Sequence, residues 1–214
     1  TNAATSIEQY IVRILEKDKR DGLRVLLERQ NLKQAIVFCN RKREVDVVYN
    51  SMRKHGFKVG ALHGDLSQAS RNETLKAFKE GNIDLLIASD VAARGLDVED
   101  LPAVINFHVP INPEDYIHRI GRTGRAGKEG KAFTLVSPHE EKHLSLIFKS
   151  LNKTIEEIQL GTDFKEEKTK EKMPSQAKKP ASSKNNSSKK SIEPQVPLPP
   201  PTIQVGFGEH VPAF

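Results

Sequence analysis

Arginine and glycine alternate regularly in one stretch of the chain. Arg119, Arg122 and Arg125 recur every third residue, and a glycine stands two positions after each of them. An arginine side chain presents a planar fork of N–H donors that matches the oxygens of a phosphate, and glycine lets a ligand approach the backbone closely. Ordinary surface ion pairs are the alternative interpretation. The spacing favours a loop that binds a phosphate-bearing anion.

The residues before this loop predict a short helix that positions it. Asn112 is a suitable N-cap and Pro113 fits the first helical position. Each glycine of the repeat disfavours a helix by roughly 1 kcal/mol, so the helix should end near Gly121. Arg122 and Arg125 are therefore expected on loop backbone.

Short apolar, β-branched runs alternate with segments of helical periodicity over much of the chain. The runs are 34–38, 58–62, 84–88, 103–109 and 131–136. Continuous apolar runs separated by helices are typical of parallel strands that are buried on both faces. We therefore predict an α/β fold, an open parallel sheet with helices on both faces.

Capping residues bound two of the connecting helices. The first should begin after Asn40, a good N-cap, and stop at Gly56. The second should be capped by Ser67 and end at Gly81. We interpret the apolar stripes of both helices, and Cys39 in its apolar run, as core.

Ligands of open parallel sheets collect at the carboxyl ends of the strands, where the connecting loops lie. Three such loops, 39–43, 63–68 and 89–97, carry cations, small residues and hydroxyl groups. A nucleic-acid backbone could lie there against helix N-termini.

Composition predicts one globular domain and one tail. The 214 residues are 36% hydrophobic and 29% charged, which suits a folded domain at 1–160 followed by a disordered Lys/Ser/Pro-rich segment at 161–214. The net charge is +6, and residues 165–214 contribute nine Lys against five Glu. This basic balance favours a polyanionic partner.

Cysteine content and hydropathy restrict the compartment. The single cysteine excludes an internal disulfide and a Cys-based metal cage, which fits a reducing compartment and predicts a cytoplasmic protein. No stretch approaches the roughly eighteen consecutive apolar residues that a membrane span needs, so we predict no membrane association. The first residue is Thr1 and not Met, so we expect the chain to be a piece of a longer protein.

The motifs together resemble the C-terminal RecA-like domain of a DEAD-box RNA helicase. They occur in the family's order, at 38–42, 63–65, Gln68 with Arg71, 89–97 and 118–125. The resemblance covers residues 1 to about 160 and implies a RecA-like sheet.

The resemblance also implies a nucleotide site. Arg122 and Arg125 match the arginine fingers that reach the γ-phosphate of ATP on another domain, and Asp97 matches the residue that holds the ATP ribose. Positions that support this loop are matched by His118, Arg119 and Arg94.

A further set of positions implies contact with the RNA backbone. The matching residues are Asn40, Arg41, Lys42, Gly64, Gln68, Arg71, Ser89 and Gly95. Two of them depart from the family pattern, because Arg41 and Ser89 stand where the family usually has threonine. Ser89 keeps the hydroxyl group, whereas Arg41 replaces a hydroxyl contact with a guanidinium group or loses it.

The chain lacks the Gly-x-x-x-x-Gly-Lys-Thr phosphate loop and the Asp-Glu-Ala-Asp segment that the family uses for ATP and magnesium. By resemblance, ATP with Mg²⁺ is held mainly by an N-terminal RecA-like domain of the same protein, absent here, and this chain alone should not hydrolyse ATP. The expected nucleic-acid partner is single-stranded or short duplex RNA, and no metal site is expected in this chain. Alternatives are a noncatalytic RNA-binding scaffold with a RecA-like fold and a DNA-directed helicase of the same superfamily.

The tail has two interpretations. Its lysines could tether RNA without sequence preference, or the segment could be a solvated linker. The prolines at 194–197 could dock a polyproline reader, and 206–214, with two phenylalanines, could bind a protein partner.

Overall fold

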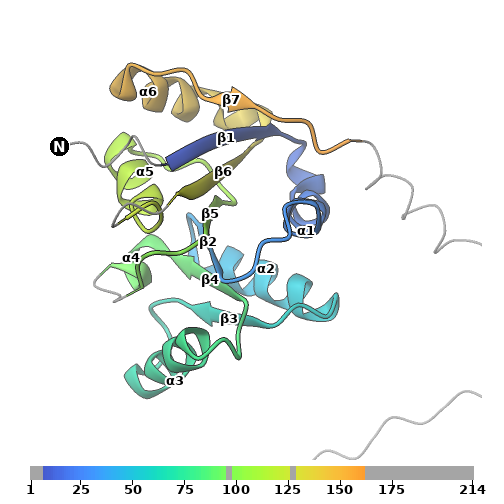
Figure 1. Cartoon of the computed structure of the whole chain (residues 1–214), viewed down its shortest axis with the longest axis vertical. Helices are drawn as coiled ribbons and strands as arrows, with labels where there is room; N and C mark the ends of the chain where they lie inside the picture. Colours follow the sequence, from blue (N-terminus) through green and yellow to red (C-terminus); the bar gives the residue numbers. More distant parts are fainter. Residues whose placement is uncertain (1–6, 95–97, 126–128, 162–214) are drawn as a thin grey trace, which may run out of the picture. The chain divides into compact units, whose positions relative to one another are not determined.

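The computed structural model describes residues 7–94, 98–125 and 129–161, and these form a parallel sheet of seven strands with helices on both faces (Figure 1). The elements follow in the order β1 (Ile7–Arg13), η1 (Glu16–Asp18), α1 (Lys19–Arg29), β2 (Ala35–Cys39), α2 (Lys42–Lys54), β3 (Val59–Leu62), α3 (Gln68–Lys79), β4 (Leu85–Ser89), α4 (Asp90–Ala93), β5 (Ala103–Asn106), α5 (Pro113–Ile120), β6 (Gly130–Val136), η2 (Pro138–Glu140), α6 (Glu141–Leu151) and β7 (Glu156–Glu157). The strand order is β3-β4-β2-β5-β6-β1-β7, and every pairing is parallel. The predicted α/β class is confirmed.

β2 shows why the sheet needs helices on both faces. All five of its side chains are buried, and they alternate between two cores. Val37 and Cys39 pack in the cluster that includes Val45 of α2, whereas Ile36 and Phe38 pack in the cluster that includes α3 and α4 residues. In Figure 1, α1 and α2 accordingly lie on one side of the sheet, and α3, α4 and α5 on the other. Burial raises the pKa of the Cys39 thiol, and the prediction that Cys39 is core is confirmed.

The five predicted strands are all present, and each begins within one residue of its expected start. The run predicted at 103–109 is too long, because β5 ends at Asn106. Beyond the strand, two side chains hold the backbone of Val109. Glu140 accepts the Val109 N–H at 3.0 Å, and Asn40 donates to the Val109 carbonyl at 3.0 Å. Phe107 still donates its N–H to the Phe38 carbonyl at 3.0 Å, and Phe107 and Val109 are buried in two of the apolar cores.

β1 was not among the predicted strands. It pairs with β6 along its whole length, from Ile7 opposite Gly130 to Arg13 opposite Val136. Ile7 and Ile11 belong to a third core cluster that also contains Tyr116 of α5. The signal for this strand was weak, because polar residues 8 and 9 follow Ile7 and the apolar run at 10–12 is only three residues long.

The predicted helix ends are confirmed. Gly56 and Gly81 follow α2 and α3 with φ of +83° and +76°, a conformation that glycine adopts without a Cβ penalty. The Ser67 hydroxyl accepts the Ser70 N–H at 3.2 Å and caps α3. α5 begins at Pro113 and ends at Ile120.

One predicted helix start is wrong. The N-cap of α2 is Arg41, with φ −131° and ψ 146°, and no side chain caps it. Asn40 does not cap the helix because its amide is bound elsewhere, to the Val109 carbonyl and to Arg119.

Within the described ranges, no helix combines the length and the apolar character that crossing a bilayer requires. The predicted tail at 161–214 lies outside the described residues except for Gly161, so the domain boundary near residue 160 stays a prediction.

Candidate nucleotide and RNA site

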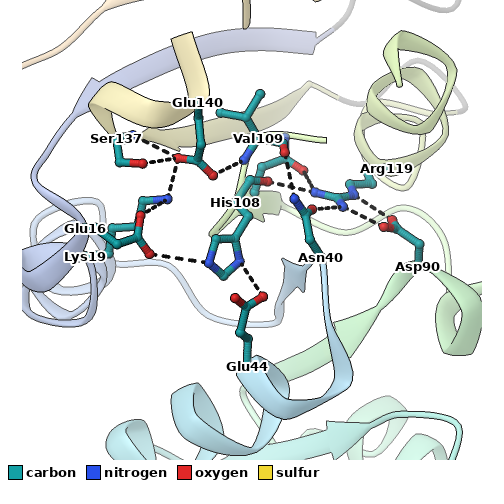
Figure 2. A network of polar contacts seen from close by, with 11 residues as sticks. Glu16, Lys19, Asn40, Glu44, Asp90, His108, Val109, Arg119, Ser137 and Glu140 are labelled. Carbon is teal, nitrogen blue, oxygen red and sulfur yellow. Dashed lines mark hydrogen bonds and ion pairs between the residues drawn. The ribbon is translucent and has the colours of Figure 1, made fainter. Parts of the chain in front are cut away.

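Arg119 is the most heavily bonded side chain of the site and is only 2% exposed. Its Nε donates to Asp90 Oδ1 and its Nη2 donates to Asp90 Oδ2, each at 2.6 Å. The same Nη2 donates to Asn40 Oδ1 at 2.8 Å, and Nη1 donates to the His108 carbonyl at 2.9 Å and to Asn106 Oδ1 at 3.3 Å. Figure 2 shows the guanidinium group between Asp90 and Asn40.

These contacts join α5 to three loops at the carboxyl edge of the sheet. Asn40 follows β2, Asp90 follows β4, and His108 follows β5. The guanidinium carbon also lies 5.2 Å from the centre of the Phe38 ring, a cation–π distance. A buried charge of this kind is stable only when it is paired and fully hydrogen-bonded. Arg119 therefore sets the position of α5 and of the loop that follows it.

The arginine loop after α5 is held against the segment that precedes β5. The Leu101 N–H donates to the Arg122 carbonyl at 3.1 Å, Leu101 and Thr123 form a β-bridge, and the Thr123 hydroxyl donates to the Leu101 carbonyl. Arg119 thus bonds to the carboxyl edge of the sheet, and Arg122 lies beside the residues that lead into the start of β5.

The two arginines after the helix converge on one carboxylate. Arg125 Nη1 lies 2.6 Å from Glu99 Oε2, and Arg122 Nη1 lies 3.9 Å from Glu99 Oε1. Arg125 Nε also donates to the Gly121 carbonyl at 2.7 Å. The side chain of Arg125 is 47% exposed and that of Arg122 is 19% exposed. Ion pairing within the domain is therefore present, and contact of these arginines with a nucleotide phosphate stays a prediction.

A shallow hollow brings several of the predicted residues together. Arg94, His118, Arg119 and Arg122 line it, together with Phe38, Asp90, Ala93 and Asp115. Arg94 Nη2 pairs with Asp115 at 3.0 Å and so links the end of α4 to α5. His118 is exposed on α5.

The loops after β2 and β3, which carry predicted RNA-binding residues, are linked by an ion pair between Lys42 and Asp65. Lys42 Nζ contacts both carboxylate oxygens of Asp65 at 2.9 Å, and this hydrogen bond holds the pKa of Asp65 below its usual value. Gly64 has open space where a Cβ would stand, so its backbone is accessible to a ligand. Arg41 is exposed at the start of α2.

Other predicted RNA-binding residues lie at the start of α3 and α4. Arg71 Nη2 donates to the Ala92 carbonyl at 3.1 Å, and Arg71 Nη1 lies 3.5 Å from Gln68 Oε1. The Arg71 Nε is buried without a hydrogen-bond partner within the part of the chain that the structure describes. Ser89 is buried, and the Asn40 amide is used by Arg119 and Val109. Gly95 and Asp97 lie outside the described residues.

The structure also contains a buried ion-pair network around Lys19, which the sequence did not predict. Lys19 is fully buried and contacts Glu140 at 2.6 Å and Glu16 at 3.2 Å, and Glu140 also accepts from the Ser137 hydroxyl and N–H (Figure 2). Two local signals were present among these residues, the i,i+3 spacing of Glu16 and Lys19 and the Ser-x-x-Glu spacing of Ser137 and Glu140, which is typical of a capping box.

His108 lies in the same network, between carboxylates of two different elements. Its Nε2 is 3.6 Å from Glu16 and its Nδ1 is 3.5 Å from Glu44. Burial lowers the pKa of His108, and the nearby Lys19 charge lowers it further, while the carboxylates oppose both effects. The pKa of Glu16 is itself held low by Lys19, whose charge and hydrogen bond together with a Ser137 contact outweigh the effect of burial.

In the described ranges, no group of three or more His, Cys, Asp or Glu side chains is arranged to hold a metal ion. The cations at the site are arginine and lysine side chains, which suit oxyanions such as phosphates.

Comparison with known proteins identifies the family. Residues 18–127 match the helicase conserved C-terminal domain. ATP-dependent RNA helicase CshA of Listeria monocytogenes is 46% identical over 159 residues, which are 74% of this chain and 31% of that protein. The chain thus spans less than a third of the length of this curated relative.

Solved structures agree with this family. E. coli DEAD-box protein SrmB, bound to regulator of ribonuclease activity A, is 35% identical with a TM-score of 0.67 over 71% of this chain and 90% of that one. S. cerevisiae Dbp5 bound to RNA and ADP BeF3 is 31% identical with a TM-score of 0.68 over 80% of this chain and 46% of that one. The chain belongs to the helicase conserved C-terminal domain family and is the C-terminal RecA-like domain of a DEAD-box helicase.

Proposed function

We propose that this domain is the second half of an ATP-dependent RNA helicase. It would bind the RNA backbone and supply Arg122 and Arg125 to the terminal phosphate of ATP on an N-terminal RecA-like domain. The convergence of both guanidinium groups on the single carboxylate of Glu99 carries the proposal, because two arginines that can share one surface oxyanion can also share a phosphate.

ATP with Mg²⁺ supplies the phosphoryl group whose transfer to water drives the cycle, and both would be held mainly by the N-terminal domain. Arg122 and Arg125 would stabilise the charge that develops on that group, a contribution that is typically worth about 10³ to 10⁵ in rate. Asp97 would hold the ribose. Arg119 would act indirectly, because its bonds to Asp90 and Asn40 set the position of the loop.

The RNA-binding surface would follow the loops at the carboxyl edge of the sheet. Lys42 and Arg71 carry positive charge there, and Gly64 leaves its backbone open to a phosphate. Contact through the sugar-phosphate backbone gives little sequence preference and strong salt dependence. Closure of the two domains on a bent strand would separate short duplexes locally.

The relatives support this proposal at the level of the family. Their names include ATP-dependent RNA helicases, and one Dbp5 structure contains RNA with ADP BeF3. We also propose a cytoplasmic location, because the one cysteine of the sequence is a buried core thiol, which suits a reducing compartment.

The test is ATP turnover by the protein that carries this domain together with its N-terminal RecA-like domain. Turnover should be low without nucleic acid and should rise with single-stranded RNA but much less with DNA of equal length, since the 2′-hydroxyl distinguishes the two. Equal stimulation by RNA and DNA would indicate a DNA-directed helicase. Binding of RNA without any turnover would indicate a noncatalytic scaffold.

A further inference from the structure

Glu99 pairs closely with Arg125 and lies at the outer limit of an ion pair with Arg122. Its carboxylate lies 2.6 Å from Arg125 Nη1 and 3.9 Å from Arg122 Nη1, and its side chain is 43% exposed. The family resemblance assigned no role to this position. Carboxylate and phosphate oxygens accept from the same donors of a guanidinium group, so the two anions would compete for these arginines.

The pairing is built into the backbone of the domain. Glu99 lies two residues before Leu101, whose N–H binds the Arg122 carbonyl at 3.1 Å and which forms a β-bridge with Thr123. The two segments that carry the acid and the arginines are therefore fastened to each other at their backbones. Their charged side chains meet because of this register.

The exposure of both side chains also favours an ion pair that a ligand can displace. Glu99 and Arg125 are both nearly half exposed, so separating them leaves each charge in contact with water and not buried without a partner. Arg119 contrasts with this pair, because it is 2% exposed and bound to Asp90 through two contacts of 2.6 Å. The exposed pair can open at small cost, whereas the buried pair cannot.

We infer that Glu99 is a positioning residue that occupies the phosphate-binding side of Arg122 and Arg125 until nucleotide displaces it. In the absence of nucleotide, Glu99 holds the two guanidinium groups together. It must release at least one Nη donor when a phosphate binds. This inference rests on the proposed function of the two arginines. An exposed ion pair contributes little free energy, so removing the Glu99 carboxylate should lower the KM for ATP by only about two- to fivefold.

The experiment uses the protein with both RecA-like domains and compares Glu99→Gln with Glu156→Gln. Both changes remove one negative charge from an exposed side chain, but Glu156 lies in β7 at the edge of the sheet. With saturating RNA, Glu99→Gln should lower the KM for ATP about two- to fivefold without lowering kcat, and Glu156→Gln should change neither. The gain should shrink as salt is raised, because salt screens exposed pairs.

Two results would overturn the inference. An unchanged or raised KM for Glu99→Gln would show that the carboxylate does not compete with nucleotide, and a reduced kcat would show that it supports the active loop. Arg125→Ala separates this from a failure of the proposed function. If Arg125→Ala abolishes turnover while Glu99→Gln behaves as the unchanged protein, only the role of Glu99 is wrong. If Arg125→Ala turns over normally, the assignment of the arginines themselves is wrong.

Discussion

Arg119 and Asp90 are joined by two contacts of 2.6 Å, one from Nε and one from Nη2. They come from α5 and from the start of α4, twenty-nine positions apart in the sequence. The remaining Nη1 is taken by Asn106 and by the His108 carbonyl. This bidentate pair connects the arginine loop to the carboxyl edge of the sheet.

Arg119→Ala should destabilise the chain by about 3–5 kcal/mol, because it leaves the Asp90 carboxylate without its charge partner in a mostly buried site. Arg119→Lys should recover only part of this loss, since an ammonium group cannot make the planar two-point contact. Urea unfolding measures both variants.

The matched control for Arg119 is Arg94→Ala. Arg94 also pairs with an aspartate, Asp115, at 3.0 Å, but its side chain is 66% exposed, so its removal should cost less than about 1 kcal/mol. Equal losses for the two alanine variants would contradict the view that burial makes Arg119 important.

Gly130→Ala should displace the arginine loop. A Cβ at this position would lie 2.5 Å from the Gly124 nitrogen and would also collide with the Thr123 hydroxyl, so the loop must move away from β6. We expect a destabilisation of about 1–3 kcal/mol, measured by urea unfolding. Gly64→Ala is the control, because its Cβ would enter open space, and its stability should stay within about 0.5 kcal/mol of the unchanged chain. Similar stabilities for both variants would be evidence against close packing of the loop on β6.

The stability of the chain should fall as the pH is lowered below the ordinary histidine range. Burial lowers the pKa of His108 in the folded state, whereas the unfolded value is about 6.5. Between these two values the unfolded chain binds the proton and the folded chain does not, so stability is complete above the unfolded pKa and decreases as the pH falls toward the folded one.

Variants can assign this pH dependence to His108. His108 faces Glu16 from η1, Glu44 from α2, and Lys19 from α1. His108→Gln removes the titrating ring and should flatten the unfolding free energy between about pH 7.5 and about pH 5.5. His118→Gln, at an exposed position, should keep the slope of the unchanged chain. A steep slope that survives in His108→Gln would assign the effect to other groups.

Deleting 165–214 should weaken RNA binding and make its salt dependence shallower. The deleted segment holds nine lysines, and each lysine that neutralises an RNA phosphate adds to the salt slope. A shorter deletion of 192–214 removes no lysine and should leave the slope unchanged. Identical slopes for the intact and the fully shortened protein would favour a solvated linker over a tether.

The sequence predicted the fold well where local signals were strong. The run at 84–88 became β4 (Leu85–Ser89), with every side chain buried, because a continuous apolar run has few other stable environments. The glycine spacing correctly predicted that the helix ends before Arg122. β1 was not predicted because its longest apolar run, 10–12, has only three residues, and its burial depends on β6, far away in the sequence.

The polar partners of the site could not be predicted in the same way. Arg119 is bound by Asn40, which lies seventy-nine positions away, and only the packed sheet brings the two together. The same holds for Lys19 and Glu140, a buried pair separated by 121 positions. The sequence therefore indicated which residues could bind a phosphate, but not which acids they contact in the folded chain.

The most direct test of the account is the turnover of Arg125→Ala in the protein with both RecA-like domains. RNA-stimulated ATP hydrolysis should fall by about 10³ to 10⁵, while ATP binding weakens far less, because the arginine acts on the phosphoryl group during transfer. Arg20→Ala, which removes an exposed arginine from α1, should turn over normally. Unchanged hydrolysis by Arg125→Ala would contradict the central claim that this domain completes a nucleotide site on another domain.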